Sequence, residues 1–276
     1  PVDISPATLA EMYLPPFKAC IDAGVQTFMS AFNDLNGEPA TGSHWLLTDL
    51  LRNQWAFKGF VVSDWNAVVQ LKAQGVVEND RDAAIMALKA GVDMDMVDGL
   101  YNAYIADAVR KGLISEFTVN TAVERILRQK YRLGLFDNPY AFLDKAREQQ
   151  TVRSAELMAL AREAATKSMV LLKNEGGVLP LSKQVRQIAV IGPLADNQAE
   201  VLGSWKARGE DADVVTVVKG LRNKLGTNAN VVYVRGCDFL DTKNNEFAKT
   251  RQAAANADVV IAVVGEKALM LSLIHI

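Results

Sequence analysis

The chain has 276 residues, of which 50% are hydrophobic and 22% are charged. That balance is typical of a globular protein and excludes a disordered tail or a collagen-like repeat. At about 150 residues per domain, the length suggests about two domains. Lys and Arg total 30 against 32 Asp and Glu, so the net charge of -2 gives no reason to expect nucleic acid or an anionic membrane surface as a partner.

Cysteine and histidine are scarce. Cys20 and Cys237 lie far apart in the sequence, and His44 and His275 are the only histidines. This pattern indicates neither a disulfide framework nor a zinc site. The longest clean apolar run, residues 259–265, is far shorter than the roughly 20 residues of a membrane helix. We therefore expect no metal and no membrane insertion.

The first half of the chain alternates between helical and strand-like patterns. In chain order the patterns predict a helix over 5–23, a strand over 25–32, a helix over 45–57, a strand over 59–63, a helix over 80–90, a strand over 92–96, and helices over 100–111 and 116–131. This order is typical of a parallel α/β layout, either a barrel or an open doubly wound sheet. A complete barrel takes about 250 residues and eight strands. A barrel here would therefore be only its last part.

Residues 134–155 differ in character, with a turn-rich break followed by a charged, linker-like stretch over 144–153. A second α/β segment then follows. It is predicted as a helix over 155–167, a strand over 169–173, a turn over 174–177, a strand over 187–191, a helix over 217–225, a strand over 231–234, a helix over 245–256 and a strand over 259–264.

Asp64 is the first candidate for chemistry, because it follows the apolar strand predicted over 59–63. The carboxyl ends of strands line the ligand crevice in α/β folds. A carboxylate there can attack a carbon, accept a proton or bind a cation. The alternative is that Asp64 caps a helix beginning at Trp65. Trp65 suits stacking on a sugar ring and equally suits packing.

Several motifs in order carry a family resemblance. Residues 58–65, KGFVVSDW, resemble the nucleophile signature of glycoside hydrolase family 3. Further matching segments are 29–33 (MSAFN), 36–39 (NGEP), 90–96 (AGVDMDM), 165–174, 179–181 (LPL) and 188–195 (IAVIGPLA). The resemblance runs from Pro1 to about Met270 and is strongest to the periplasmic bacterial β-glucosidases, which implies a periplasmic location.

The resemblance implies a fold and a mechanism. Residues 1–134 would be the C-terminal part of a (β/α)8 TIM barrel, 135–154 a linker and 155–270 the first part of an α/β sandwich domain. Asp64 would be the nucleophile of a retaining β-glucosidase that acts on terminal β-glucosyl residues of glucosides or oligosaccharides. A glutamic acid would protonate the leaving oxygen. That chemistry requires no cofactor.

The resemblance also implies sugar-binding residues, each with a plainer alternative. Met29, Ser30 and Asn33 end the strand beside that of Asp64, although a methionine there is more often core packing. Trp65 and Trp205 would sandwich the sugar, whereas Trp205 could equally anchor a surface loop. We interpret Asp93 and Asp95 as structural residues at the end of the barrel, and His44 as a packing or capping residue near the helix that Ser43 opens.

The acid/base glutamate stays unassigned. Residues 264–266 (VGE) match the stretch that precedes it in the family, but Glu266 itself fits a strand-end residue better. The match stops after Met270, so we expect the acid to be missing and residues 271–276 to be a non-native tail. A barrel that lacks most of its strands would also expose unpaired strand edges, which would promote aggregation.

Other functions stay open. One is a catalytically inactive fragment that at most binds sugar, and another is a β-xylosidase or N-acetylglucosaminidase relative. A nucleotide-binding or receiver-type α/β protein is disfavoured by the lack of a phosphate-binding glycine loop. The sequence does not indicate an oligomeric state.

Overall fold

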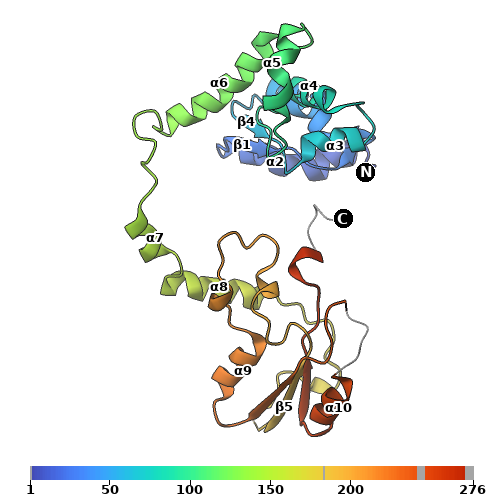
Figure 1. Ribbon diagram of the computed structural model, residues 1–276, viewed down its shortest axis with the longest axis vertical. Helices are drawn as coiled ribbons and strands as arrows, with labels where there is room; N and C mark the ends of the chain where they lie inside the picture. The colour runs from blue at the N-terminus through green and yellow to red at the C-terminus, as the bar shows by residue number, and fades with distance from the viewer. Residues whose placement is uncertain (1, 183, 241–245, 271–276) are drawn as a thin grey trace. The chain divides into compact units, whose positions relative to one another are not determined.

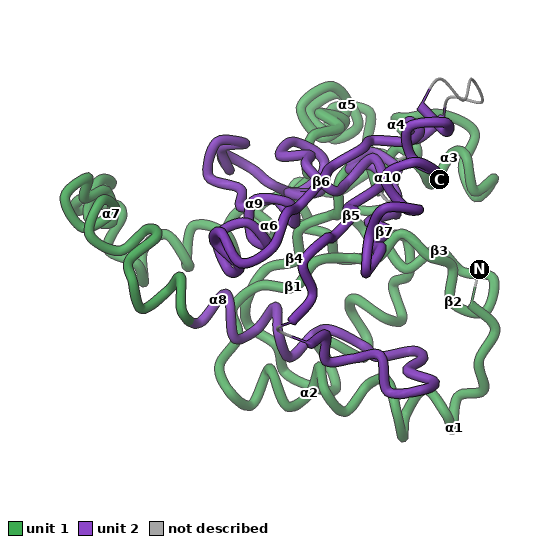
Figure 2. Tube along the Cα trace, turned by 90° about the horizontal axis from the view of Figure 1, so that it is seen from below, with its two compact units in different colours: residues 1–159 green, residues 160–276 purple. Residues whose placement is uncertain are grey.

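The computed structural model describes residues 2–182, 184–240 and 246–270 (Figure 1). The chain divides into two compact units, Pro1–Ala159 and Leu160–Ile276, which Figure 2 colours separately. Each unit has its own hydrophobic core and its own parallel strands. The α/β class predicted from the sequence is confirmed.

Unit 1 is mainly helical around a small parallel pair of strands. Its elements are α1 (Pro6–Thr8), a π-helical turn (Leu9–Tyr13), α2 (Leu14–Asp22), β1 (Thr27–Met29), β2 (Asp34–Leu35), β3 (Glu38–Pro39), a 3₁₀ turn (Ala40–Gly42), a π-helix (Trp45–Gln54), β4 (Phe60–Val62), α3 (Ala67–Ala73), α4 (Asp80–Ala90), α5 (Leu100–Arg110), α6 (Glu116–Arg132) and α7 (Lys145–Thr151). α8 (Ala155–Ser168) crosses the boundary between the units.

The core of unit 1 lies between the strands and helices α3 to α5. Val61 of β4 and Leu71 of α3 are fully buried. Helix α4 contributes the small side chains Ala83, Ala84 and Ala87, all fully buried, so its axis can approach its neighbours closely. Helix α4 begins where Asn79 accepts a hydrogen bond from the Asp82 N–H, as an N-cap residue does.

Strands β1 and β4 are parallel, with Met29 opposite Val62. The strand predicted over 92–96 is reduced to a single parallel bridge between Val62 and Met94. The cause is the side chain of Asp93, which accepts the Val61 N–H at 2.9 Å in place of a backbone carbonyl. A regular ladder of backbone hydrogen bonds therefore does not form along this segment. The strand predicted over 92–96 is thus shorter than expected, with one bridge only.

Unit 2 contains a parallel sheet in the order β6-β5-β7. Its elements are a 3₁₀ turn (Glu175–Gly177), β5 (Gln187–Ile191), 3₁₀ turns (Glu200–Leu202 and Asp211–Asp213), α9 (Val217–Leu225), β6 (Asn230–Val234), α10 (Phe247–Ala255), β7 (Val259–Ala262) and a 3₁₀ turn (Ala268–Met270). β5 lies in the centre, and its register pairs Ile188 with both Val231 and Val259. Val218 of α9 packs with Ile188 and Val190 in the core.

The segment that joins the two cores is largely exposed. Helix α7 lies inside the predicted linker, and the Asp144 side chain caps it by accepting the Arg147 N–H at 2.9 Å. The strand predicted over 169–173 was wrong, because residues 169–173 have no regular structure and Leu172 is 90% exposed. Apolar residues form a strand only where a neighbouring strand pairs with them. No such partner lies beside this segment among the described residues.

Candidate functional site

The candidate site lies where β1 and β4 end. Ser63 extends the pairing by one residue beyond β4, since its N–H donates to the Met94 carbonyl at 2.8 Å. Ser63 is fully buried, and the next residue, Asp64, is half-buried. Side chains alternate between faces along an extended chain, so Asp64 faces the same side as Val62 and the opposite side from Ser63. The Asp64 carboxylate therefore emerges at the carboxyl end of a parallel strand.

The side chain of Asp64 is held by its own turn. Its Oδ1 accepts the Trp65 N–H at 2.7 Å. Helix α3 begins later, at Ala67, and its N-cap residue Asn66 makes no side-chain capping bond. The alternative that Asp64 caps a helix beginning at Trp65 is thus wrong. Within the described ranges, no backbone N–H donates to the second oxygen of the Asp64 carboxylate.

Apolar side chains flank Asp64. Met29 is 51% exposed and Trp65 is 39% exposed. Met29 pairs with Val62, and Val62 is two residues before Asp64. Met29, Val62 and Asp64 therefore face the same side of the strand pair. Exposed apolar side chains beside a carboxylate form a surface that suits the C–H face of a sugar ring.

The other predicted residues differ in placement. Ser30 is only 3% exposed, and its Oγ pairs with the Thr41 Oγ1 at 2.9 Å, so its side chain serves packing in this unit. Asn33 is exposed, and its carbonyl accepts the Ala40 N–H at 3.1 Å. Trp205 belongs to unit 2 and is 70% exposed, so its ring does not pack in the core of that unit.

A buried ionic network supports the strands below the site. Both oxygens of Asp93 are used, since Arg125 donates to Oδ1 at 2.7 Å and Arg52 donates to Oδ2. Arg52 also donates to the carbonyls of Gly59 and Gly91 at 3.0 and 3.1 Å. Burial lowers the pKa of the Arg52 guanidinium, against the opposing effect of Asp93. The structural role that the sequence analysis gave Asp93 is confirmed.

Asp98 is a residue that sequence reasoning missed. Its Oδ2 accepts the N–H groups of Val68 and Val69, both at 3.0 Å, at the start of α3. Burial raises the pKa of the Asp98 carboxyl, although these two N–H groups act in the opposite direction. The signal available in the sequence was weak, because an aspartate before a glycine at 98–99 is typical of any turn.

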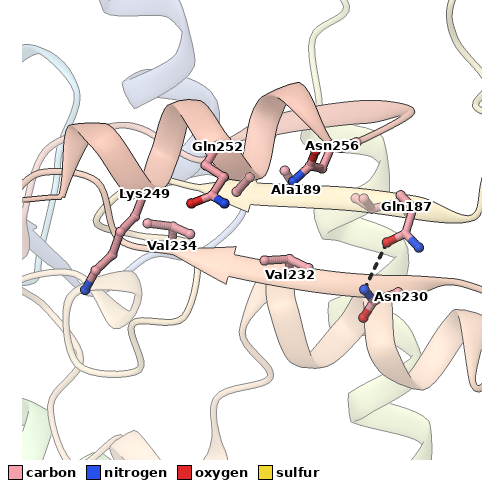
Figure 3. A pocket seen from close by; sticks show the side chains of 11 residues that line it. Gln187, Ala189, Asn230, Val232, Val234, Lys249, Gln252 and Asn256 are labelled. Carbon is pink, nitrogen blue, oxygen red and sulfur yellow. Dashed lines mark hydrogen bonds between the residues drawn. The ribbon is translucent and has the colours of Figure 1, made fainter.

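Unit 2 holds a hollow of about 500 Å³ between α10 and the sheet (Figure 3). Ala189 and Val232 form its floor, and amide side chains line it, including Gln187 and Asn230, which are bonded to each other at 2.9 Å. No carboxylate is among the described residues that line it. This hollow therefore lacks the carboxyl groups that carboxylate-based hydrolysis requires.

Glu266 is exposed on the segment after β7, and residues 271–276 lie outside the described residues. The 2–182, 184–240 and 246–270 ranges hold no group of three or more His, Cys, Asp or Glu side chains placed for a metal ion. Across the same ranges, none of the helices combines the length and apolar composition that crossing a bilayer requires.

Two family models match most of the chain. The N-terminal domain of glycosyl hydrolase family 3 matches residues 1–129, and the C-terminal domain of the same family matches residues 169–271. The chain belongs to glycoside hydrolase family 3. The resemblance read from the ordered motifs is confirmed.

Known relatives within family 3 are glycosidases by name. A periplasmic β-glucosidase of Salmonella typhimurium is 41% identical over 96% of this chain, and a β-xylosidase of Formosa agariphila is 37% identical over 95%. The structure of a β-glucosidase of Listeria innocua in complex with glucose matches with a TM-score of 0.83 at 35% identity, over 99% of this chain. The chain spans 38% of both curated relatives and 37% of the solved chain.

Proposed function

We propose that the chain carries the nucleophile of a retaining β-glucosidase, and that Asp64 is that nucleophile. The observation that carries the proposal is the half-buried carboxylate at the carboxyl end of β4, beside exposed Trp65 and Met29, in a family 3 chain. Strand ends of this kind supply catalytic residues in parallel α/β barrels.

In this mechanism the Asp64 carboxylate attacks the anomeric carbon of a terminal β-glucosyl residue. The bond from that carbon to the leaving oxygen breaks, and a general acid protonates the oxygen. Water then attacks the same carbon, releases Asp64 and returns a proton to the acid/base residue. The second carboxyl has to lie about 5–5.5 Å away. We assign that group to none of the described residues, Glu266 included.

The proposal extends to the domains and the location. Residues 1–134 would be the last part of a (β/α)8 barrel, 135–154 a linker and 155–270 the first part of an α/β sandwich. Met29, Trp65, Asn33 and Trp205 would contact the sugar, whereas the burial of Ser30 favours a backbone or packing role. The name of the Salmonella typhimurium relative supports a periplasmic location.

A β-xylosidase is the second candidate, supported by the relative from Formosa agariphila. Glucose and xylose differ by one hydroxymethyl group, and discrimination of that size depends on a few pocket contacts. The alternative that is not an enzyme is an inactive fragment that at most binds sugar.

The test compares hydrolysis of p-nitrophenyl β-glucoside and p-nitrophenyl β-xyloside by the chain and by Asp64→Asn. Asparagine retains an oxygen for the Trp65 N–H, so the fold should persist. We expect a loss of at least about 10³-fold in kcat, as for other nucleophiles. Asp107→Asn, an exposed carboxylate on α5, is the matched control. Retention of activity within about ten-fold in folded Asp64→Asn would refute the assignment. No hydrolysis by any variant would favour the inactive fragment.

A further inference from the structure

The turn that carries Asp64 has two bonds of its own: the Asp64 Oδ1 accepts the Trp65 N–H at 2.7 Å, and the Asp64 carbonyl accepts the Ala67 N–H at 3.1 Å. It joins β4 to α3 through Asn66, whose φ of 59° lies in the left-handed region. Asparagine tolerates that region better than most residues, but it remains less favourable than a right-handed conformation. Asn66 also leaves the first N–H groups of α3 without a local side-chain acceptor. The first N–H groups of α3 therefore need acceptors from outside the turn.

A second segment, residues 94–98, supplies these contacts. Met94 accepts the Ser63 N–H at 2.8 Å, and the Met96 N–H donates to the Ser63 Oγ at 2.8 Å. These bonds attach the segment to the residue directly before Asp64. The Asp98 carboxylate then bonds the N–H groups of Val68 and Val69, directly after the turn. Segment 94–98 therefore brackets the turn on both sides.

The segment is itself under strain. Val97 has a φ of 74°, which is an outlier for a β-branched residue, and its side chain is 56% exposed. Such a conformation is unfavourable and persists only where the surroundings determine it. Here the bonds of Met96 and Asp98 lie on either side of Val97. The same bonds therefore maintain the strained segment and the Asp64 turn together.

We infer that Asp98 is a positioning residue for Asp64: its carboxylate oxygen fixes the start of α3 and thereby the direction of the Asp64 side chain. This inference rests on the proposed function. Asp98 is four residues from the bridge at Met94 and touches α3 rather than Asp64, so it acts through the backbone. An asparagine oxygen at this position can accept the same two N–H groups.

The test measures covalent labelling of Asp64. The probe is 2,4-dinitrophenyl 2-deoxy-2-fluoro-β-glucoside, whose leaving group departs without acid assistance. Its reaction therefore reports the nucleophile independently of the acid/base residue. The labelling rate is followed by intact mass, and the labelled residue by peptide mapping. The variants are Asp98→Ala and Asp98→Asn, with Asp107→Ala as the exposed control and Leu71→Ala as a destabilising control within α3.

We expect Asp98→Ala to slow labelling between about ten- and a hundred-fold, the effect of a displacement of about 1 Å in a reacting group. Asp98→Asn should stay within about three-fold of the unmodified chain, because it retains the acceptor. Leu71→Ala should label at the normal rate per folded molecule, which separates positioning from loss of stability. Equal rates in Asp98→Ala and the unmodified chain, or equal slowing in Asp98→Ala and Asp98→Asn, would overturn the inference. If the unmodified chain is not labelled at Asp64, the proposed function fails, and the inference with it.

Discussion

Replacement of Asp93 by alanine should destabilise unit 1 strongly. The Asp93 side chain is 1% exposed and the Arg52 side chain is 6% exposed, so both charges of this pair are buried. Removal of one partner from a buried ion pair costs about 3–5 kcal/mol, because the other charge stays buried without compensation. Arg125 adds less, since its side chain is 25% exposed and can turn toward water.

The backbone contributes a second cost. The Val61 N–H, in the fully buried centre of β4, loses its acceptor when Asp93 is removed. An unsatisfied buried donor costs about 1–3 kcal/mol. The two costs overlap in part, so we expect a loss of about 4–6 kcal/mol in the free energy of unfolding. Domains are typically stable by only about 5–15 kcal/mol, so the variant approaches the limit of folding.

Urea unfolding followed by tryptophan fluorescence measures this loss. Trp45, Trp55 and Trp65 lie in unit 1, so the signal reports mainly that unit. With a slope near 2 kcal/mol per molar urea, the midpoint should fall by about 2–3 M. Asp107→Ala, at an exposed site on α5, should shift it little. A loss below about 1 kcal/mol in Asp93→Ala would refute the reasoning that the network is a buried, mutually dependent unit.

Two further predictions concern unit 2. Gly192→Ala should destabilise it by more than about 2 kcal/mol in urea unfolding, because a Cβ there would stand 2.2 Å from the Val263 carbonyl oxygen. Gly176→Ala, also at a positive φ but in open space, should cost only about 1 kcal/mol. Equal losses in the two variants would contradict the steric argument. The pKa of Asp258 is lowered from its usual value because its carboxylate accepts the backbone N–H groups of Gln187 and Arg186. The stability that the Asp258 carboxylate contributes is fully present above its pKa in the unfolded chain, and it is lost as pH falls through its pKa in the folded chain. The stability difference between the unmodified chain and Asp258→Asn should therefore be constant near neutral pH and shrink below about pH 4; a difference independent of pH would contradict it.

The sequence predicted the helices of unit 1 well where capping and periodicity agree. Asn79 and Gly91 delimit α4 as their residue types suggest, and α6 begins after the Ser115 cap. Strand prediction was less successful because pairing depends on distant residues. The carboxylate of Asp93 replaces a ladder bond and shortens the third strand, which no local pattern announces.

The sequence indicated the central residue of the candidate site, Asp64, but not the residues whose contacts hold the surrounding backbone, Arg52 and Asp98. Asp64 stands out because a carboxylate follows an apolar strand, and the family motif marks the same position. Arg52 could not be recognised as buried, because a charged residue in a helix is normally solvated. Its partners Gly59, Gly91 and Asp93 lie 7, 39 and 41 residues away in the sequence, which is farther than one helical turn. Asp98 likewise acts on α3 from 29 and 30 residues away, which periodicity cannot reveal.

The strand order of unit 2 has a consequence for synthesis of the chain. β5 is the central strand, yet both of its partners follow it, β6 at Asn230–Val234 and β7 at Val259–Ala262. As the chain leaves the ribosome, β5 emerges without either neighbour. Its apolar residues Ile188 and Val190 therefore stay unpaired until β6 has been translated, and the other edge of β5 stays open until β7 follows. Non-local pairing of this kind is slow. Among the described strands, β5 is thus the one that waits longest during translation for its last partner.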